Sequence, residues 1–190
     1  HRTSRRQRQM CIRDRQRINA RFSKDKNILK IPQPIIMKNG SKIMSLIDGS
    51  KKMSKSDPNE GSRINLLDTP EIITKKIKRA KSDSYIGIEF NNPERAESKN
   101  LIMIYSILSG KEISQCENEF SETGWGTFKK LITEQLIESL EPIQEKYEVL
   151  INDPYQLNKI LLEGKEKAEN LANQTLKRVK SKLGFFEIEK

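Results

Sequence analysis

The sequence has few of the residues that build metal sites and disulfide frameworks. Its two cysteines, Cys11 and Cys116, lie far apart and without the spacings of His or Cys ligands, and it has a single histidine, His1. We therefore expect neither a zinc site nor a disulfide framework, and this usage fits a reducing compartment. Long apolar runs are also lacking, because the run at residues 101–108 is interrupted by Ser106 and is far below the roughly 18 residues of a membrane span. There is no signal-peptide pattern either, so the sequence predicts a cytoplasmic protein.

Acidic residues are in the minority among the charged ones. The chain has 26 aspartates and glutamates against 36 lysines and arginines, a formal net charge of +10. Such an excess indicates an anionic partner, either a nucleotide or a nucleic acid. Hydrophobic residues make up only 34% of the sequence, but they recur at regular spacings, which is typical of a folded protein.

The first fifteen residues differ in composition from the rest. Residues 1–15 hold six arginines and one acid, Asp14, and show neither helical nor strand periodicity. One interpretation is a basic arm that binds nucleic acid. We favour another, because residues 5–14 resemble the translation of a sequencing adapter. We therefore expect a non-native leader, to be excluded from fold reasoning. Without it the formal net charge would fall by five.

The strongest functional signal is the stretch KKMSKSD at residues 51–57, here called the lysine loop. An apolar run at residues 42–46 leads into it, and the dipeptide Asn39-Gly40 before that run is typical of a β-hairpin turn. We expect a short hairpin that holds the loop at the edge of a sheet. Ammonium groups, hydroxyls and backbone N–H donors together suit a polyphosphate, although a charge run of this kind is more often a solvated basic turn.

Helix signals dominate the remainder of the chain. The stretch DTPE at residues 68–71 has the capping hydroxyl, the proline and the acid of a helix start. Apolar residues then recur every three to four positions in five or six helices, which we expect to form a bundle. A helix should end near Gly164, and lysines and arginines at residues 72–81 and on the terminal helix could track nucleic-acid phosphates. The residues predicted to face inward on that terminal helix are Ala168, Leu171, Ala172, Thr175, Leu176, Val179 and Leu183.

Residues Lys52 to Ser56 resemble, one for one, the second signature of class I aminoacyl-tRNA synthetases, a mobile loop that closes over the triphosphate of ATP. Residues 42–46, 72–84, 98–101 and 124–126 extend the resemblance. Together these segments are similar to bacterial tryptophanyl-tRNA synthetases over about residues 16–190. The tyrosine-specific relatives usually carry a phenylalanine–glycine variant of the loop, which disfavours them.

The resemblance implies an ATP-dependent ligase that activates tryptophan to tryptophanyl-adenylate and transfers it to tRNA(Trp). The implied catalytic residues are Lys52 and Lys55, as ammonium donors to the β- and γ-phosphates. The implied ATP-binding residues are Ile43, Lys52, Met53, Ser54, Lys55 and Ser56. Backbone atoms of Ile43 and Met53 would contact adenine, although Ile43 fits a plain strand core equally well. Mg²⁺ is expected with the ATP phosphates, but nothing in the chain looks like its dedicated ligand cage.

The implied fold is mainly α-helical. Residues 16–67 would be the C-terminal remnant of a Rossmann-type α/β catalytic domain, and residues 68–190 a helical linker and the bundle that binds the tRNA anticodon. The family's first signature, its tryptophan pocket and most of the interface of the expected homodimer are not in this sequence. We therefore expect this fragment alone to bind ATP weakly and to be inactive. The alternative is a non-catalytic basic helical RNA-binding module, in which the lysine loop is only a phosphate contact.

Overall fold

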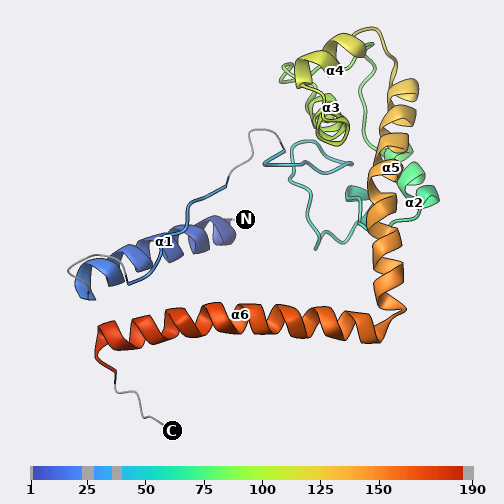
Figure 1. Cartoon of the computed structure of the whole chain (residues 1–190). Helices are drawn as coiled ribbons and strands as arrows, with labels where there is room; N and C mark the ends of the chain where they lie inside the picture. The colour runs from blue at the N-terminus through green and yellow to red at the C-terminus, as the bar shows by residue number, and fades with distance from the viewer. Residues whose placement is uncertain (1, 23–27, 36–39, 186–190) are drawn as a thin grey trace. The chain divides into compact units, whose positions relative to one another are not determined.

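The computed structural model describes residues 2–22, 28–35 and 40–185, with side chains from residue 11 onward. Its described part is mainly helical, as the sequence predicts (Figure 1). Two compact units contain these elements: residues 36–152 form the central unit, and residues 1–35 with 153–190 form the terminal unit. The elements in chain order are α1 (Arg2–Phe22), the 3₁₀ helix η1 (Glu60–Ser62), α2 (Pro70–Arg79), α3 (Ala96–Ser109), α4 (Ile113–Glu119), α5 (Trp125–Ile151) and α6 (Pro154–Leu183). The division after residue 67 stays a prediction.

Helix α2 begins where the sequence predicts, because its start is encoded locally. The hydroxyl of Thr69 accepts a hydrogen bond from the N–H of Ile72 at 3.4 Å, and Pro70 occupies the first helical position. Proline loses nothing there, since the first N–H groups of a helix have no partner within it. Ile73 and Ile77, four residues apart, then place one face of α2 in the core.

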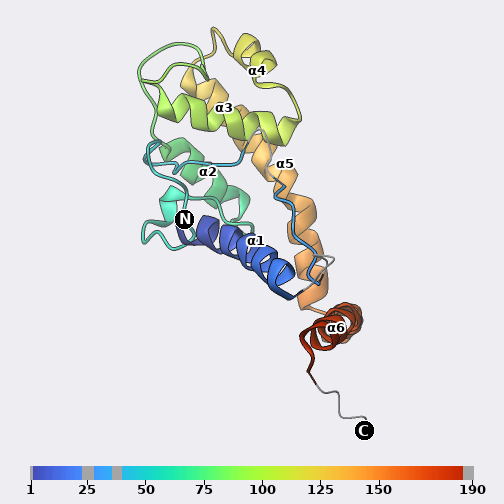
Figure 2. The same cartoon turned by 90° about the vertical axis from the view of Figure 1, so that its left-hand side faces the viewer.

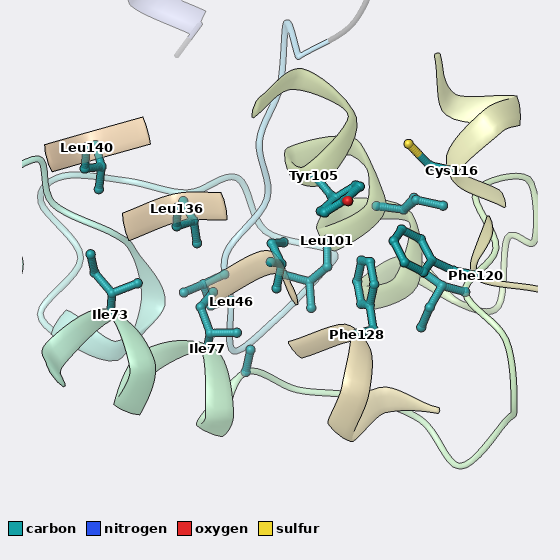
Figure 3. Packing of buried hydrophobic residues seen from close by; sticks show 14 residues of the cluster. Leu46, Ile73, Ile77, Leu101, Tyr105, Cys116, Phe120, Phe128, Leu136 and Leu140 are labelled. Atoms are coloured by element: carbon teal, nitrogen blue, oxygen red, sulfur yellow. The ribbon is translucent and has the colours of Figure 1, made fainter. Parts of the chain in front are cut away.

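The core of the central unit lies where α2 and α3 pack against α5 and where α4 packs against α3 (Figures 1 and 2). Aromatic rings fill its middle: Phe120 packs edge-on against Tyr105 at 5.0 Å and against Phe128 at 4.8 Å between ring centroids. Such pairs contribute about 0.5–1.5 kcal/mol beyond the burial of their area. The buried apolar side chains around them (Figure 3) include Leu46, Ile73, Ile77, Leu101, Cys116, Leu136 and Leu140.

The apolar stripe predicted along α5 is buried only in its first half. Phe128 and Ile132 are fully buried and Leu140 is the last buried residue, whereas Ile143 and Tyr147 are exposed. The contacts become polar beyond that point: the side-chain amide of Gln144 donates to the backbone carbonyls of residues 66 and 68 at 2.8 and 3.0 Å. The buried apolar part of α5 therefore ends at Leu140.

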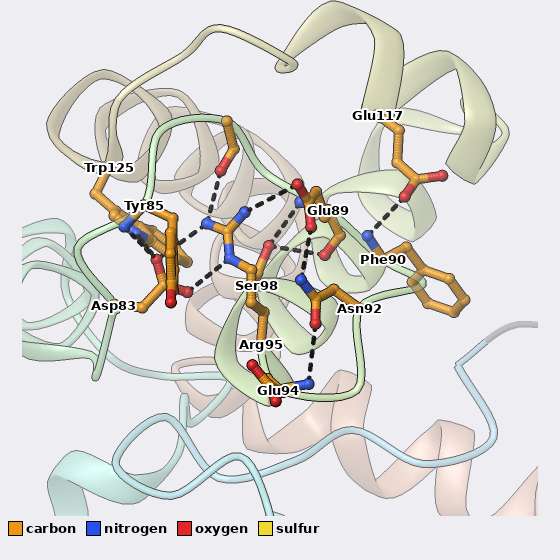
Figure 4. Close-up of polar contacts among 11 residues, drawn as sticks. Asp83, Tyr85, Glu89, Phe90, Asn92, Glu94, Arg95, Ser98, Glu117 and Trp125 are labelled. Carbon is orange, nitrogen blue, oxygen red and sulfur yellow. Dashed lines mark hydrogen bonds and ion pairs between the residues drawn. The ribbon is translucent and has the colours of Figure 1, made fainter.

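A buried arginine organises the loop between α2 and α3 (Figure 4). Arg95 is 2% exposed, and its guanidinium donates to the carboxylate of Asp83 at 2.8 and 3.0 Å and to the carbonyl of Gly87 at 2.7 Å. Trp125, the first residue of α5, donates its indole N–H to the same carboxylate at 3.0 Å. Burial acts to raise the pKa of Asp83, but the hydrogen bonds from Arg95 and Trp125 outweigh it and hold that pKa below its ordinary value.

In the terminal unit, α1 includes residues without helical periodicity. Residues 1–15 lack that periodicity in the sequence, yet α1 begins at Arg2. Residues 2–22 contain no glycine or proline and are rich in arginine and glutamine, so their intrinsic propensity favours a helix even without an apolar stripe. That residues 1–15 are a non-native leader stays a prediction, because the presence of a helix says nothing about their origin. The side-chain amide of Asn19 pairs with both backbone groups of Leu29, at 2.7 Å each.

Two predictions about the last helix are wrong. No helix ends near Gly164, because α6 continues through it from Pro154 to Leu183. One glycine costs only about 1 kcal/mol relative to alanine, too little to break so long a helix. The seven residues predicted to face inward are not buried either; Thr175, Val179 and Leu183 are half-buried and the others exposed. The predicted packing of apolar helix faces against one another is therefore found among α2–α5. Helix α6 has no buried residue.

Candidate functional site

The lysine loop grows out of a short antiparallel pairing. The N–H of Ser45 donates to the carbonyl of Lys51 at 2.8 Å, and the N–H of Met53 donates to the carbonyl of Ile43 at 3.0 Å. Met44 and Lys52 lie opposite each other between these bonds, as an isolated β-bridge. We call residues 43–53 the loop hairpin.

This pairing differs from the hairpin that the sequence predicts. The expected turn at Asn39-Gly40 lies partly outside the described residues, which leave out 36–39. In the described part of the chain, the run at residues 42–46 pairs instead with the first residues of the lysine loop. Its turn is made by residues 47–50, where Asp48 supplies the side chain that closes it. Residues 51–53 of the lysine loop therefore form one arm of the hairpin.

Asp48 fixes the turn of the loop hairpin. Its carboxylate accepts hydrogen bonds from the hydroxyl of Ser50 at 2.6 Å and from the N–H of Ser50 at 3.0 Å, and it lies 3.1 Å from the ammonium of Lys51. The Ser50 hydroxyl first, and then Lys51, lower the pKa of Asp48 to about 2. The carboxylate therefore stays ionised at neutral pH and occupies Lys51, the first lysine of the loop.

The second half of the lysine loop is a tight polar turn. The N–H of Asp57 donates to the carbonyl of Ser54 at 3.3 Å, and the hydroxyls of Ser54 and Ser56 lie 3.1 Å apart. Arg63 holds the end of this turn, because its guanidinium donates to the carbonyl of Asp57 at 2.7 Å. This arrangement presents two hydroxyls and the side chain of Lys55 on one exposed turn.

Helix α3 holds the loop hairpin at two points. Asn100 accepts a hydrogen bond from the N–H of Met44 at 2.8 Å and donates one to its carbonyl at 2.9 Å. The carboxylate of Glu97 pairs with Lys81 at 2.9 Å and also accepts from the N–H of Gly49 in the turn. Burial acts to raise the pKa of Glu97, but Lys81 first, and then the backbone N–H groups of Glu97 and Gly49, outweigh it and the pKa is lowered. The hairpin is thus fixed to the helical part of the chain.

The six predicted ATP-binding residues lie on the loop hairpin and on the polar turn that follows it, residues 54–57. Lys52, Lys55 and Ser56 are exposed, and Ser54 is half-buried. The side chains of Ile43 and Met53 line a small apolar cavity of about 200 Å³, together with core residues of α2, α3 and α5. The side chain of Met53 is partly buried and packs against the core cluster.

Sequence reasoning missed the residues that support the loop. These residues are Glu97 and Asn100, which contact the hairpin, and Arg63, which contacts the carbonyl of Asp57. Glu97 and Asn100 lie more than 40 residues beyond the hairpin in the sequence, and only Arg63 is close to it. The one available signal was Asn100 itself, a polar residue directly before the buried Leu101 in an apolar stretch of α3. A side chain in that setting needs a polar partner, but the sequence does not say which.

The basic surface is smaller than the sequence predicts. Lys76 was expected to face solvent with its neighbours on α2, but it is buried and bonded to the carboxylate of Asp68. Lys75, Lys78 and Arg79 are exposed as expected. Between α2 and α5 lies a cavity of about 570 Å³ with Lys78, Lys129, Lys130 and Trp125 in its lining. Lys129 is already engaged there, because its ammonium donates to the carbonyl of residue 80 at 2.6 Å, and burial lowers its pKa.

Two classes of site are absent from the part of the chain that the structure describes. Within residues 2–22, 28–35 and 40–185, no group of three or more His, Cys, Asp or Glu side chains is arranged to hold a metal ion. None of the helices in these ranges is both long and apolar enough to span a bilayer.

The comparison with known protein families decides the relationship. The family model described as "tRNA synthetases class I (W and Y)" matches residues 12–141, which include the loop hairpin and α2–α4. The chain belongs to this family.

Relatives within the family are tryptophan-specific by name. A tryptophan–tRNA ligase of Prochlorococcus marinus subsp. pastoris is 81% identical over 175 residues, 92% of this chain and 52% of that protein. Another, from Prochlorococcus marinus strain SARG, is 60% identical over 90% of this chain and 51% of that protein. The crystal structure of tryptophanyl-tRNA synthetase from Mycoplasma pneumoniae superposes with a TM-score of 0.74 at 30% identity, over 83% of this chain and 48% of that one. The chain spans about half the length of these relatives.

Proposed function

We propose that the chain is part of a tryptophan–tRNA ligase, which uses ATP to form tryptophanyl-adenylate and transfers tryptophan to tRNA(Trp). The observation that carries this proposal is the 81% identity over 92% of the chain to a relative of that name. The exposed lysine loop, mounted on a hairpin in the helical core, supplies the element that the proposed chemistry requires.

In the proposed reaction, the tryptophan carboxylate attacks the α-phosphate of ATP and pyrophosphate leaves. Negative charge grows on the leaving group in the transition state, so donors that tighten there raise the rate. Lys52 and Lys55 are the proposed ammonium donors to the β- and γ-phosphates, and both are exposed on the loop. Ser54 and Ser56, whose hydroxyls lie 3.1 Å apart, are proposed to add hydroxyl and N–H contacts.

The adenine contact is proposed for the backbone of Ile43 and Met53. Their pairing uses the N–H of Met53 and the carbonyl of Ile43, which are bonded to each other at 3.0 Å.

Several wider features belong to the proposal for the whole protein. Mg²⁺ would bind through the ATP phosphates, since Mg²⁺ commonly relies on substrate phosphates with few protein ligands. Residues 16–67 are proposed to complete a Rossmann-type α/β catalytic domain, and the helices after residue 68 to contact the anticodon of tRNA(Trp). A homodimer and a cytoplasmic location are part of the same proposal.

Tryptophan-dependent exchange of pyrophosphate into ATP tests this function. The chain would be joined to the part of the 81%-identical relative that it does not cover, and assayed beside the 190-residue chain alone. We expect exchange that requires tryptophan in the joined protein, and none in the chain alone. A joined, folded protein that binds tRNA but shows no exchange with any amino acid would instead support the RNA-binding module.

A further inference from the structure

We infer that Asn100 is a positioning residue for the lysine loop, which it holds in register through the backbone of Met44. The inference rests on the proposed function in one respect, namely that the positioned loop binds ATP. Asn100 itself touches no reacting atom in this assignment. It acts 56 positions away in sequence, through two hydrogen bonds to one residue.

The direction of the Met44 backbone groups follows from the pairing of the hairpin. In an antiparallel pair, hydrogen-bonded and non-hydrogen-bonded positions alternate, and the N–H and C=O groups of a non-hydrogen-bonded residue point away from the partner strand. Met44 and Lys52 occupy such a position, because the cross-strand bonds join the residues on either side of them. Both polar backbone groups of Met44 therefore point away from the loop and need another partner.

Asn100 supplies that partner with a single side chain. Its oxygen accepts from the Met44 N–H at 2.8 Å and its amide nitrogen donates to the Met44 carbonyl at 2.9 Å, and the side chain lies in the core with 3% of its surface exposed. A primary amide presents the donor and the acceptor that a neighbouring strand would present. Asn100 thus replaces the next strand of a sheet at the edge where the hairpin meets α3.

Two features make this contact a device for positioning. Met44 follows Ile43, the proposed adenine contact, and lies opposite Lys52, the proposed phosphate donor. At the other end of the hairpin, Gly49 approaches α3 so closely that an added Cβ would lie 2.9 Å from the backbone carbon of Ala96. A shift of the loop along or away from α3 therefore breaks the two hydrogen bonds between Asn100 and Met44.

The chain contains a matched control for this contact. In the terminal unit, Asn19 makes the same pair of bonds to Leu29, at 2.7 Å each, and is also 3% exposed. Asn19→Ala and Asn100→Ala therefore remove the same atoms and the same two hydrogen bonds from equally buried sites. They differ in whether the released backbone belongs to the loop hairpin.

Amide hydrogen exchange on the 190-residue chain tests the structural half of the inference. We expect Asn100→Ala to speed exchange at Met44, Ser45 and Met53 by about tenfold or more, because the Met44 N–H loses its hydrogen-bond partner. The core amides of Ile102 and Ile132 should keep their wild-type rates. Asn19→Ala should speed exchange at Leu29 and leave the hairpin unchanged. Equal acceleration of hairpin and core amides would show a purely structural role and overturn the inference, as would no acceleration at the hairpin.

Pyrophosphate exchange in the joined full-length protein tests the functional half. We expect Asn100→Ala to lower kcat/KM for ATP by about 10- to 100-fold, because small displacements of a binding group have effects of that size, with KM for tryptophan unchanged. Asn19→Ala should leave both constants near wild type. The positioning role is overturned if KM for tryptophan rises together with the fall in kcat/KM for ATP. It is also overturned if kcat/KM for ATP does not fall. If the unsubstituted joined protein shows no exchange, the proposed function fails by itself, whereas the hydrogen-exchange result still decides whether Asn100 holds the hairpin.

Discussion

The ammonium of Lys76 on α2 and the carboxylate of Asp68 just before that helix form a buried ion pair, with the two side chains 10% and 8% exposed. The carboxylate also accepts from the N–H and the side-chain amide of Asn65, at 2.9 and 3.2 Å. Burial acts to raise the pKa of Asp68, but Lys76 and Asn65 outweigh it and the pKa is lowered. One lysine of the apparently uniform basic helix is thereby internal, and its role is to hold the chain between η1 and α2.

Replacing Lys76 should therefore destabilise the central unit. Removing one partner of a buried pair leaves an uncompensated charge and typically costs about 3–5 kcal/mol, so Lys76→Met should lower the free energy of unfolding by that order in urea titrations. Lys75→Met is the control, because Lys75 is exposed on the same helix and such substitutions usually stay within about 0.5 kcal/mol. Equal effects of the two substitutions would contradict the burial of Lys76.

The Asp83–Arg95–Trp125 network predicts a loss of stability in acid. The pKa of Asp83 is lower in the folded protein than its ordinary value of 3.8. Its contribution is therefore fully present above pH 3.8 and is lost as the pH falls from there through the folded pKa. Asp83→Asn cannot titrate, so its stability should be lower than wild type at pH 7, with the difference shrinking towards pH 3. Urea midpoints measured at intervals between pH 7 and pH 3 test this, and a difference that widens in acid would contradict it.

Lys55 should matter more for the rate than for ATP affinity. Loss of one transition-state donor typically costs about 3–4 kcal/mol, so Lys55→Ala in the joined full-length protein should lower kcat for pyrophosphate exchange far more than it raises KM for ATP. Lys51→Ala is the matched control, because its ammonium is paired with Asp48 at 3.1 Å and an exposed pair is worth at most about 1 kcal/mol. A pure KM effect at Lys55 would rule out the proposed role.

Gly49 should not tolerate a side chain. A Cβ there would lie 2.9 Å from the backbone carbon of Ala96 and 3.0 Å from the backbone nitrogen of Glu97. Overpacking against backbone commonly costs about 1–3 kcal/mol, so Gly49→Ala should lower stability by that amount and loosen the turn at Asp48. The control is Gly126→Ala in α5, where an added Cβ meets nothing within 4 Å and alanine favours the helix by up to about 1 kcal/mol. Chemical denaturation of both variants makes the comparison. A Gly49→Ala protein as stable as wild type would contradict the prediction and show that α3 can move to make room for the added methyl group.

The parts of the fold that could be predicted are those with local causes. The start of α2 is encoded by Thr69 and Pro70 in four consecutive residues, and the buried face of α5 by Phe128 and Ile132 at helical spacing. The same reasoning was wrong for α6. Its residues have helical periodicity, and they form a helix, but periodicity does not say whether another element covers the apolar side.

The sequence by itself carried the prediction of this protein's chemistry. Lysines, serines and backbone N–H donors at residues 51–57 suit phosphate groups, and the order of residues 52–56 resembles the family's second signature without reference to the rest of the fold. Only the tertiary structure decided what the loop is attached to. The pairing of Met44 with Asn100, the close approach of Gly49 to α3, and the burial of Lys76 join residues that are distant in sequence or alike in local pattern. Which residues become partners depends on how the helices pack, because a buried polar group needs a second polar group within hydrogen-bond distance.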